Sequence, residues 1–369
     1  MTRREFGVIA AGAAGELVAA EKESLMYVGT YTRGGSKGIY GYKFNPATGK
    51  LTEIGVAAEV QNPSFLYVTP DGRHLYAVGE ASTGMVTAYN VDRATGKLSK
   101  LNDEATGGNG PCHLAADKTG RNLVIVHYGS GNVSVFKLKA DGSVGERTAL
   151  VQDTGEPGAD KKRQDKAHAH SVNFSKSGKY AVVADLGLDE YIVYELDPAK
   201  GTLTKHSTAN VKPGSGPRHF NFHPNYKFAY GVNELSSTVT GFDWNEPAGK
   251  LTEKQTISTL PADFKGTSYC AEILVHPSGK YVYASNRGHD SLAMFSIASD
   301  GKLTSLGTVS VEGKTPRNFR IHPSGAWVIA ANQDSGNLVV YKVDKSTGKL
   351  TATGEQAKVP YPVCIKFIV

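Results

Sequence analysis

Long apolar runs are missing from nearly all of this 369-residue chain. Beyond the N-terminal segment, no stretch approaches the roughly 20 apolar residues that a membrane-spanning helix requires, so we expect no membrane partner. Basic residues are dispersed although the net charge is +6, and this pattern argues against a nucleic-acid partner. A content of 40% hydrophobic and 21% charged residues is typical of a soluble globular protein.

Cysteine is also scarce. The three cysteines, Cys112, Cys270 and Cys364, are an odd number and lie in or beside repeated strands, which predicts small buried side chains rather than disulfides or metal ligands. His168 and His170 share one strand face, but no Cys or Asp set accompanies them, so we expect no metal. We expect no cofactor and no serine nucleophile elbow, because the chain lacks a Gly-rich phosphate loop before a helix and a Gly-x-Ser-x-Gly motif.

Sustained helical periodicity is absent as well, and a short phrase is repeated instead. Its clearest copies are GPRHFNFHP at Gly216–Pro224, TPRNFRIHP at Thr315–Pro323, YCAEILVHP at Tyr269–Pro277 and GPCHLAADK at Gly110–Lys118. The seven copies align on Pro63, Pro111, Ala169, Pro217, Cys270, Pro316 and Pro362, in steps of 46 to 58 residues. One polar insertion, TGEPGADKKRQDK at 154–166, lengthens a step and is predicted to be a loop.

Each repeated unit contains four predicted strands. In the fifth unit they are His219–Phe222, Phe228–Val232, Thr238–Trp244 and a strand that begins at Leu251, joined by tight turns. The 42 glycines and 18 tyrosines suit such a pattern. Four antiparallel strands at this period predict an all-β, seven-bladed β-propeller.

The two ends of the chain predict how the ring closes. Leu25–Gly55 supplies three strands and lacks the first strand of a blade, whereas Tyr361–Phe367 is a lone first strand. We therefore expect the C-terminal strand to complete the first blade, within one domain that spans residues 25–369. Residues 1–24 form a leader in which Arg3-Arg4 resembles a twin-arginine signal. The protein is periplasmic or exported if that signal functions, and cytoplasmic otherwise.

Titratable residues gather at one end of the predicted ring. The start of each first strand and the end of each second strand meet there, and we call this end the variable mouth because its residues differ between units. The opposite end, the turn mouth, repeats Pro-Ser-Gly-Lys-like turns, whose histidines we expect to be structural (His223, His276 and His322). Diversity at one end of a repetitive scaffold marks a binding face.

The variable mouth predicts an anionic ligand. Arginines at Arg218, Arg287 and Arg317 suit a carboxylate or phosphate. Glu234 or His170 could act as general base, and an arginine could stabilise charge on a reacting carbonyl. Alternatively, the arginines and carboxylates pair across blades and only hold the ring together.

Several segments resemble the seven-bladed propeller lactonases, a family that includes propeller-type 6-phosphogluconolactonase and the fungal carboxy-muconate lactonizing enzyme. The resemblance is carried by AHAHSVNF at Ala167–Phe174, GPRHFNFHP at Gly216–Pro224 and SNRGHDS at Ser285–Ser291, and extends from Leu25 to the end. It implies hydrolysis of 6-phospho-glucono-1,5-lactone in the pentose phosphate pathway. The catalytic residues that it implies are His170, Arg218, Glu234 and Arg287.

The resulting hypothesis is a metal-independent lactonase that acts as a monomer on a small anionic lactone. The expected substrate-binding residues are His113, His127, His168, His219, Glu272, Asn286, Arg317 and Gln333. Two other functions remain open. The protein could be a lactonizing cyclase for muconate-like acids, or a non-catalytic exported propeller that binds a ligand or a protein.

Overall fold

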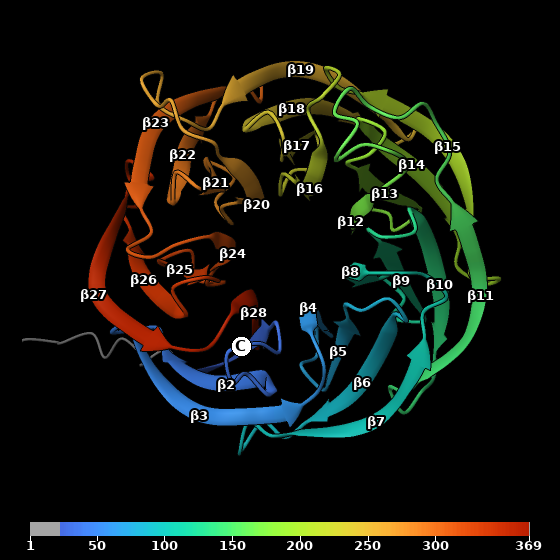
Figure 1. Cartoon of the computed structure of the whole chain (residues 1–369), viewed down its shortest axis with the longest axis horizontal. Helices are drawn as coiled ribbons and strands as arrows, with labels where there is room; N and C mark the ends of the chain where they lie inside the picture. Colours follow the sequence, from blue (N-terminus) through green and yellow to red (C-terminus); the bar gives the residue numbers. More distant parts are fainter. Residues whose placement is uncertain (1–22, 369) are drawn as a thin grey trace, which may run out of the picture.

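The computed structural model describes residues 23–368, which fold into a ring of sheets around a central axis (Figure 1). In this range the chain forms 28 strands, arranged as seven antiparallel sheets of four strands each. The predicted all-β, seven-bladed propeller is therefore confirmed. The predicted twin-arginine-like leader lies outside the described residues, apart from its last two positions. Nowhere in the described range is there a helix with the length and apolar character needed to cross a membrane.

The strands form four concentric layers (Figure 1). The innermost are β4 (Pro63–Val68), β8 (Pro111–Ala116), β12 (Ala169–Phe174), β16 (Pro217–Phe222), β20 (Tyr269–Val275), β24 (Pro316–Ile321) and β28 (Pro362–Ile368). The second layer contains β1 (Ser24–Thr30), β5 (His74–Gly79), β9 (Asn122–His127), β13 (Tyr180–Asp185), β17 (Phe228–Asn233), β21 (Tyr281–Arg287) and β25 (Trp327–Asn332).

The two outer layers complete each blade. The third layer contains β2 (Gly38–Asn45), β6 (Met85–Val91), β10 (Asn132–Leu138), β14 (Glu190–Asp197), β18 (Thr238–Asn245), β22 (Ser291–Ile297) and β26 (Asn337–Val343). The outermost contains β3 (Lys50–Glu59), β7 (Leu98–Ala105), β11 (Val144–Gln152), β15 (Thr202–Asn210), β19 (Lys250–Ser258), β23 (Leu303–Ser310) and β27 (Leu350–Lys358).

The burial of each layer explains its sequence. Every residue of β9 and β13 is buried, because the second strand of a blade lies between two neighbouring blades, and both strands read as nearly continuous apolar runs. The outer strand β15 instead is mostly exposed or half-buried, in keeping with its polar sequence. Five innermost strands begin at an aligned proline. Proline has no N–H to donate, so it is confined to positions such as the first residue of a strand.

Repeated side-chain contacts join neighbouring blades. A tyrosine in the second strand of one blade donates a hydrogen bond to a turn glycine of the next, as in Tyr76–Gly142, Tyr230–Gly301 and Tyr283–Gly348, each with a hydroxyl-to-carbonyl distance of 2.8 Å. At the turn mouth, the Nε2 atoms of His223 and His276 lie 2.8 Å from the carbonyl oxygens of Gly279 and Gly325. These contacts give the turn histidines a structural role.

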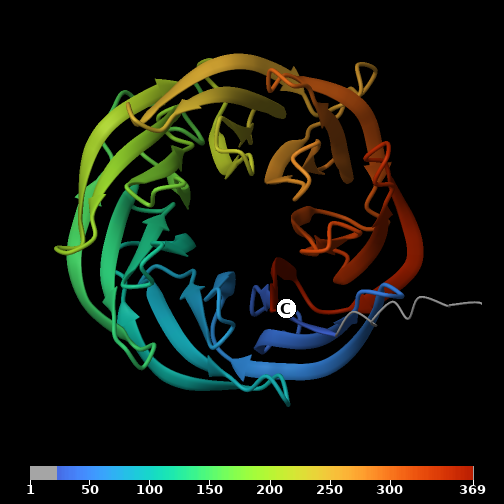
Figure 2. The same cartoon turned by 180° about the vertical axis from the view of Figure 1, so that it is seen from behind.

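The C-terminal strand closes the ring. β28 pairs with β1 in antiparallel register, with Leu25 opposite Ile368 and Val28 opposite Ile365, and the first sheet has the order β28-β1-β2-β3. Figures 1 and 2 show the C-terminus on the inner side of the ring, next to the first blade. The predicted closure is confirmed, and it pairs the edge of β1 that would otherwise be unpaired at the seam.

Two buried carboxyl groups, Asp153 and Asp185, lie near the start of β12. Asp153 and Asp185 are 3% and 0% exposed, and Tyr194 donates a hydrogen bond to Asp153. Burial raises the pKa of Asp153 to about 6, and burial together with the charge of Asp153 raises the pKa of Asp185 well above its usual range. Both carboxyl groups therefore bind protons more tightly in the folded protein than an ordinary aspartate does. Asp185 Oδ1 also accepts a hydrogen bond from the His168 backbone N–H at 2.8 Å, so the pair fixes the start of β12.

We expect removal of residues 360–369 to lower the melting temperature by at least about 10 °C, measured by calorimetry. The deletion removes the pairing partner of β1 and the buried side chains of Val363, Ile365 and Ile368. The point variant Ile365→Ala keeps the strand, and we expect it to cost only about 2–5 kcal/mol. An unchanged melting temperature after truncation would contradict closure by β28.

We expect the free energy of unfolding to fall by on the order of 2 kcal/mol as pH rises from about 4 to 7, owing to the Asp153–Asp185 pair. Because the folded-state pKa is raised, the folded protein binds a proton that the unfolded chain has released, and this stabilisation is lost as pH rises through about 6. Urea unfolding of Asp153→Asn should therefore show a flatter pH dependence than the wild type. The exposed variant Asp263→Asn should retain the wild-type slope.

Candidate active site

A cavity of about 170 Å³ opens at the variable mouth. It is lined by Glu80, Cys112, Tyr128, Arg163, His170, Glu234, Arg287 and Arg317. Three of the four predicted catalytic residues line it directly. The fourth, Arg218, is 2% exposed and is bonded to Glu234. The structure thus brings together all four residues and the predicted binding residue Arg317.

A repeated β-bulge positions the residues of the first strands. The pairing of β16 with β17 shifts between Pro217 and His219, so Arg218 is the extra residue of the strand. The same shift makes His170 the extra residue of β12 and Arg317 that of β24. A bulge redirects a side chain and is common beside active sites. The repeat therefore provides one such position per blade at the variable mouth.

Alternation along the second strands decides which of their residues face the cavity. Asn233, the last residue of β17, is fully buried inside the blade, whereas Glu234 lines the cavity. The Glu234 N–H donates to the carbonyl oxygen of Gly216 at 2.6 Å, and Gly216 has a φ of 66°, a left-handed conformation that glycine adopts without strain. The residue after the strand is thereby held at the mouth.

Glu234 is the electrostatic centre of the site. Its Oε2 atom lies 2.9 Å from Arg218 Nε and 2.9 Å from Arg287 Nη2, and its Oε1 atom lies 2.5 Å from Arg163 Nη2. Burial alone would raise the pKa of Glu234, but Arg287, Arg218 and Arg163 together hold it well below its usual range. Glu234 is therefore ionised at neutral pH, and its lone pairs are engaged by three guanidinium groups.

His170 has the opposite character. It is 5% exposed, and burial together with the positive charge of Arg218 lowers its pKa well below its usual value, so the ring is neutral at physiological pH. Its Nδ1 atom lies 3.8 Å from Cys112 Sγ, and its Nε2 atom has no hydrogen-bond partner among residues 23–368. A neutral imidazole with a free nitrogen beside a cavity is equipped to accept a proton.

Two arginines retain free donors. Arg287 donates from Nη2 to the carbonyl oxygen of Cys270 at 2.9 Å, but its buried Nε atom has no partner in the described structure. Arg317 forms no ion pair with any described residue, and its guanidinium lies 5.3 Å from the centroid of the Tyr31 ring. The Arg317 guanidinium lines the cavity, so its donors are available for a negatively charged or carbonyl oxygen of a ligand.

A second layer of polar residues lies next to His170. The Nδ1 atom of His219 is 2.8 Å from Glu272 Oε1, and Asn318 donates to the other oxygen of Glu272. The rings of His113 and His170 each lie edge-on to His219, with centroid distances of 5.4 Å. Burial lowers the pKa values of His113 and His219. None of His113, His219 and Glu272 lines the cavity, and the three form a connected polar group beside His170.

Four other predicted binding residues also lie outside the cavity. His127 is the last residue of β9 and Asn286 the next-to-last residue of β21, and both are fully buried within blades, where His127 Nδ1 lies 3.0 Å from the Asn132 carbonyl oxygen and Asn286 donates to the Thr259 carbonyl oxygen. They occupy the same position as Asn233, and strand alternation turns all three away from the mouth. The side chain of Gln333 donates to its neighbour Asp334 instead.

His168 holds the insertion in place and does not reach the cavity. Its Nδ1 atom lies 2.6 Å from the Tyr128 carbonyl oxygen and its Nε2 atom 2.9 Å from Asp165 Oδ1. Its ring stacks on the Tyr128 ring at a centroid distance of 4.5 Å. Both ring nitrogens contact oxygen acceptors, so His168 joins the residue that follows β9 to the end of the insertion.

The catalytic and binding residues expected from the sequence do not include four residues that line the cavity, Glu80, Cys112, Tyr128 and Arg163. Glu80 and Tyr128 follow β5 and β9 and align with Glu234, so strict alternation along the repeat would have identified them. Arg163 comes from the polar insertion and has no counterpart in the repeat. Its only signal in the sequence was the basic run Lys161-Lys162-Arg163.

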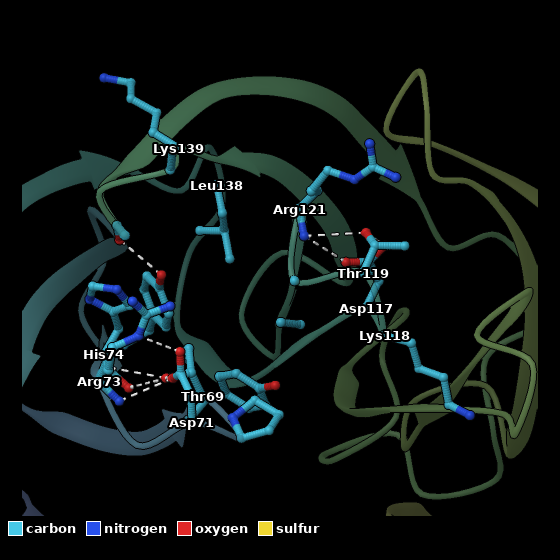
Figure 3. Close-up of a pocket in the computed structure, with 17 residues that line it drawn as sticks. Thr69, Asp71, Arg73, His74, Asp117, Lys118, Thr119, Arg121, Leu138 and Lys139 are labelled. Carbon is cyan, nitrogen blue, oxygen red and sulfur yellow. Dashed lines mark hydrogen bonds and ion pairs between the residues drawn. The ribbon is translucent and has the colours of Figure 1, made fainter.

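A larger hollow lies at the turn mouth and has a different character. It measures about 680 Å³ and lies between the second and third blades, around Tyr67 and Leu138. Figure 3 shows that Lys118, Arg121 and Lys139 extend in different directions, away from one another. The cations therefore do not converge on a ligand position. In the described range, no group of three or more His, Cys, Asp or Glu side chains is arranged to hold a metal ion.

Comparison with known proteins identifies the family. Residues 25–367 match the family described as "Lactonase, 7-bladed beta-propeller". A 6-phosphogluconolactonase of Bacillus subtilis is 38% identical over 344 residues, which cover 93% of this chain and 97% of that protein. A 6-phosphogluconolactonase of Formosa agariphila is 37% identical over 336 residues, which cover 88% of this chain and 94% of that protein. The periplasmic gluconolactonase of Pseudomonas aeruginosa superimposes with a TM-score of 0.89 at 32% identity, over 94% of this chain and 99% of that one. This chain belongs to the seven-bladed β-propeller lactonase family.

Proposed function

We propose that this lactonase hydrolyses a sugar lactone that carries an anionic group, with 6-phospho-glucono-1,5-lactone as the first substrate to test. One observation carries the proposal. A single cavity contains a neutral histidine, His170, and arginines that outnumber the carboxylates Glu80 and Glu234. This excess of positive charge favours an anionic ligand. The names of the two bacterial 6-phosphogluconolactonase relatives support the choice of substrate.

His170 is the general base in this proposal, and Glu234 organises the arginines. A base must be unprotonated and must have a free lone pair, and the neutral ring of His170 meets both conditions. Glu234 is ionised, but its three arginine partners occupy its oxygens. Of the two bases expected from the sequence, the geometry favours His170.

The reaction then follows from the free donors. His170 Nε2 accepts a proton from water as the water oxygen bonds to the lactone carbonyl carbon. Arg317 and the guanidinium of Arg287, which both line the cavity, stabilise the negative charge that develops on the carbonyl oxygen. The bond from the carbonyl carbon to the ring oxygen breaks, and the imidazolium returns its proton to that oxygen. Only side chains of this protein take part.

A pH-stat assay on glucono-, 6-phosphoglucono- and muconolactones distinguishes the competing functions. Hydrolysis of the sugar lactones supports the proposal, and activity on muconolactone alone would identify a lactonizing cyclase. Absence of activity on all three would favour a binding propeller. A monomer and the two alternative compartments stay predictions, which size-exclusion chromatography and cell fractionation would test.

We expect Glu234→Ala and Arg287→Ala each to lower kcat/KM by about tenfold to a thousandfold, because each removes a charge that organises or stabilises the transition state. The assay is steady-state hydrolysis with folding checked by circular dichroism. Lys314→Ala, an exposed change near the same mouth, is the matched control and should retain activity. Full activity in both site variants would refute the site.

We expect His170→Gln to lower kcat/KM by about a hundredfold or more, the usual contribution of a general base. In the wild type, kcat/KM should stay constant as pH falls through about 6.5, the ordinary pKa of histidine, and should decline only at lower pH. Activity should persist in mild acid because the lowered pKa keeps the His170 ring unprotonated there. A decline that begins above pH 6.5, or one that persists in His170→Gln, would show that another group is the base.

A further inference from the structure

We propose that Arg163 is a specificity-determining residue that binds a phosphate or carboxylate carried by the substrate away from its lactone carbonyl. This inference rests on the proposed function and concerns the rim of the same cavity. Arg163 lies on the insertion between β11 and β12, which is the longest departure from the repeat. The insertion thus adds to the cavity a charge that the repeated scaffold does not supply.

The insertion is anchored so that Arg163 has a defined position. Gln164 is fully buried and donates to the Leu186 carbonyl oxygen at 2.8 Å, and its own side-chain oxygen accepts from the Asp160 N–H at 2.9 Å. The Arg163 N–H donates to the Asp160 carbonyl oxygen at 3.0 Å. The contact between His168 Nε2 and Asp165 Oδ1 fixes the C-terminal end of the insertion. Such anchoring lowers the entropy that ligand binding would cost.

Arg163 is the outermost guanidinium around Glu234. Its side chain is 34% exposed, compared with 2% for Arg218 and 15% for Arg287. Its guanidinium lies 5.8 Å from the centroid of the Tyr269 ring, and Tyr269 is among the most exposed large apolar residues of the described structure. A substituent that projects from a buried lactone ring toward solvent would therefore meet Arg163 before any other arginine around Glu234.

The charge arrangement allows Arg163 to change partners. Of the two carboxylate oxygens of Glu234, Arg163 contacts only Oε1, while Arg218 and Arg287 both contact Oε2. Arg163 also donates to the Tyr128 hydroxyl at 3.4 Å. If Arg163 turns toward a substrate anion, Glu234 remains paired with two arginines and stays ionised. Arg163 would then exchange its charge-assisted hydrogen bond to Glu234 for one to the substrate anion. No buried charge would be left unpaired by this exchange.

The test compares three sugar acids that differ only at carbon 6. Gluconate has no distal anion, glucarate has a distal carboxylate and 6-phosphogluconate has a distal phosphate. Calorimetric titration of the full chain should show that Arg163→Ala weakens binding of one or both distal anions relative to gluconate by about tenfold to a hundredfold, the range for a lost charge-assisted hydrogen bond. Arg163→Lys should lose less. The exposed neighbouring variant Lys162→Ala should leave the ratio unchanged.

The pattern across probes separates the outcomes. A larger loss for 6-phosphogluconate assigns Arg163 to phosphate, and a larger loss for glucarate assigns it to carboxylate. Equal weakening of all three acids would show that Arg163 acts only through Glu234 and would overturn the proposal. So would an unchanged ratio, or a wild type that does not distinguish the distal anions from gluconate. Because binding is measured without turnover, failed lactone hydrolysis would reject the proposed function and leave this result intact.

Discussion

The pairing of β28 with β1 is the constraint on which the rest of this molecule depends. Each blade buries its second strand between two neighbours, so a ring with an open seam would expose apolar runs like those of β9 and β13. Antiparallel hydrogen bonds between the two ends of the chain remove that seam. Closure also holds all innermost strands around one axis, which allows side chains from distant blades to meet in one cavity.

The cavity depends in turn on how a buried carboxylate is compensated. Glu234 follows β17, and its three arginine partners come from β16, β21 and the insertion before β12. An unpaired carboxylate at this depth would cost several kcal/mol. Among the described residues, the same pairing leaves Arg317 without an ion-pair partner and the Nε atom of Arg287 without a hydrogen-bond partner. The sequence left two hypotheses open for these arginines, ring stabilisation or ligand binding, and the structure shows that they divide between ion pairing and free donors.

Much of the site could be predicted because the repeat places equivalent residues at equivalent positions. His170, Arg218 and Arg317 are the extra residues of the same bulge in three blades, so alignment alone places them at one mouth. The alignment failed where a one-residue difference matters. His127 and Asn286 lie at aligned positions and turn into the blade, whereas the residues that follow them, Tyr128 and Arg287, reach the cavity. Near a strand end, hydrophobic alternation is too weak to show which residue points into the blade and which points toward the cavity.

The sequence by itself determined the number of blades, the aligned start of the first strands, the closing strand and the end of the ring that carries charge. These features follow from local patterns repeated along the chain, namely apolar runs, turn glycines and prolines that begin strands. Only the tertiary structure decided that Arg163 reaches Glu234, that His170 is neutral and that Glu234 is held ionised. Proton affinities depend on burial and on charges from other blades, and the path of an irregular insertion depends on anchors such as Gln164 that no periodicity marks.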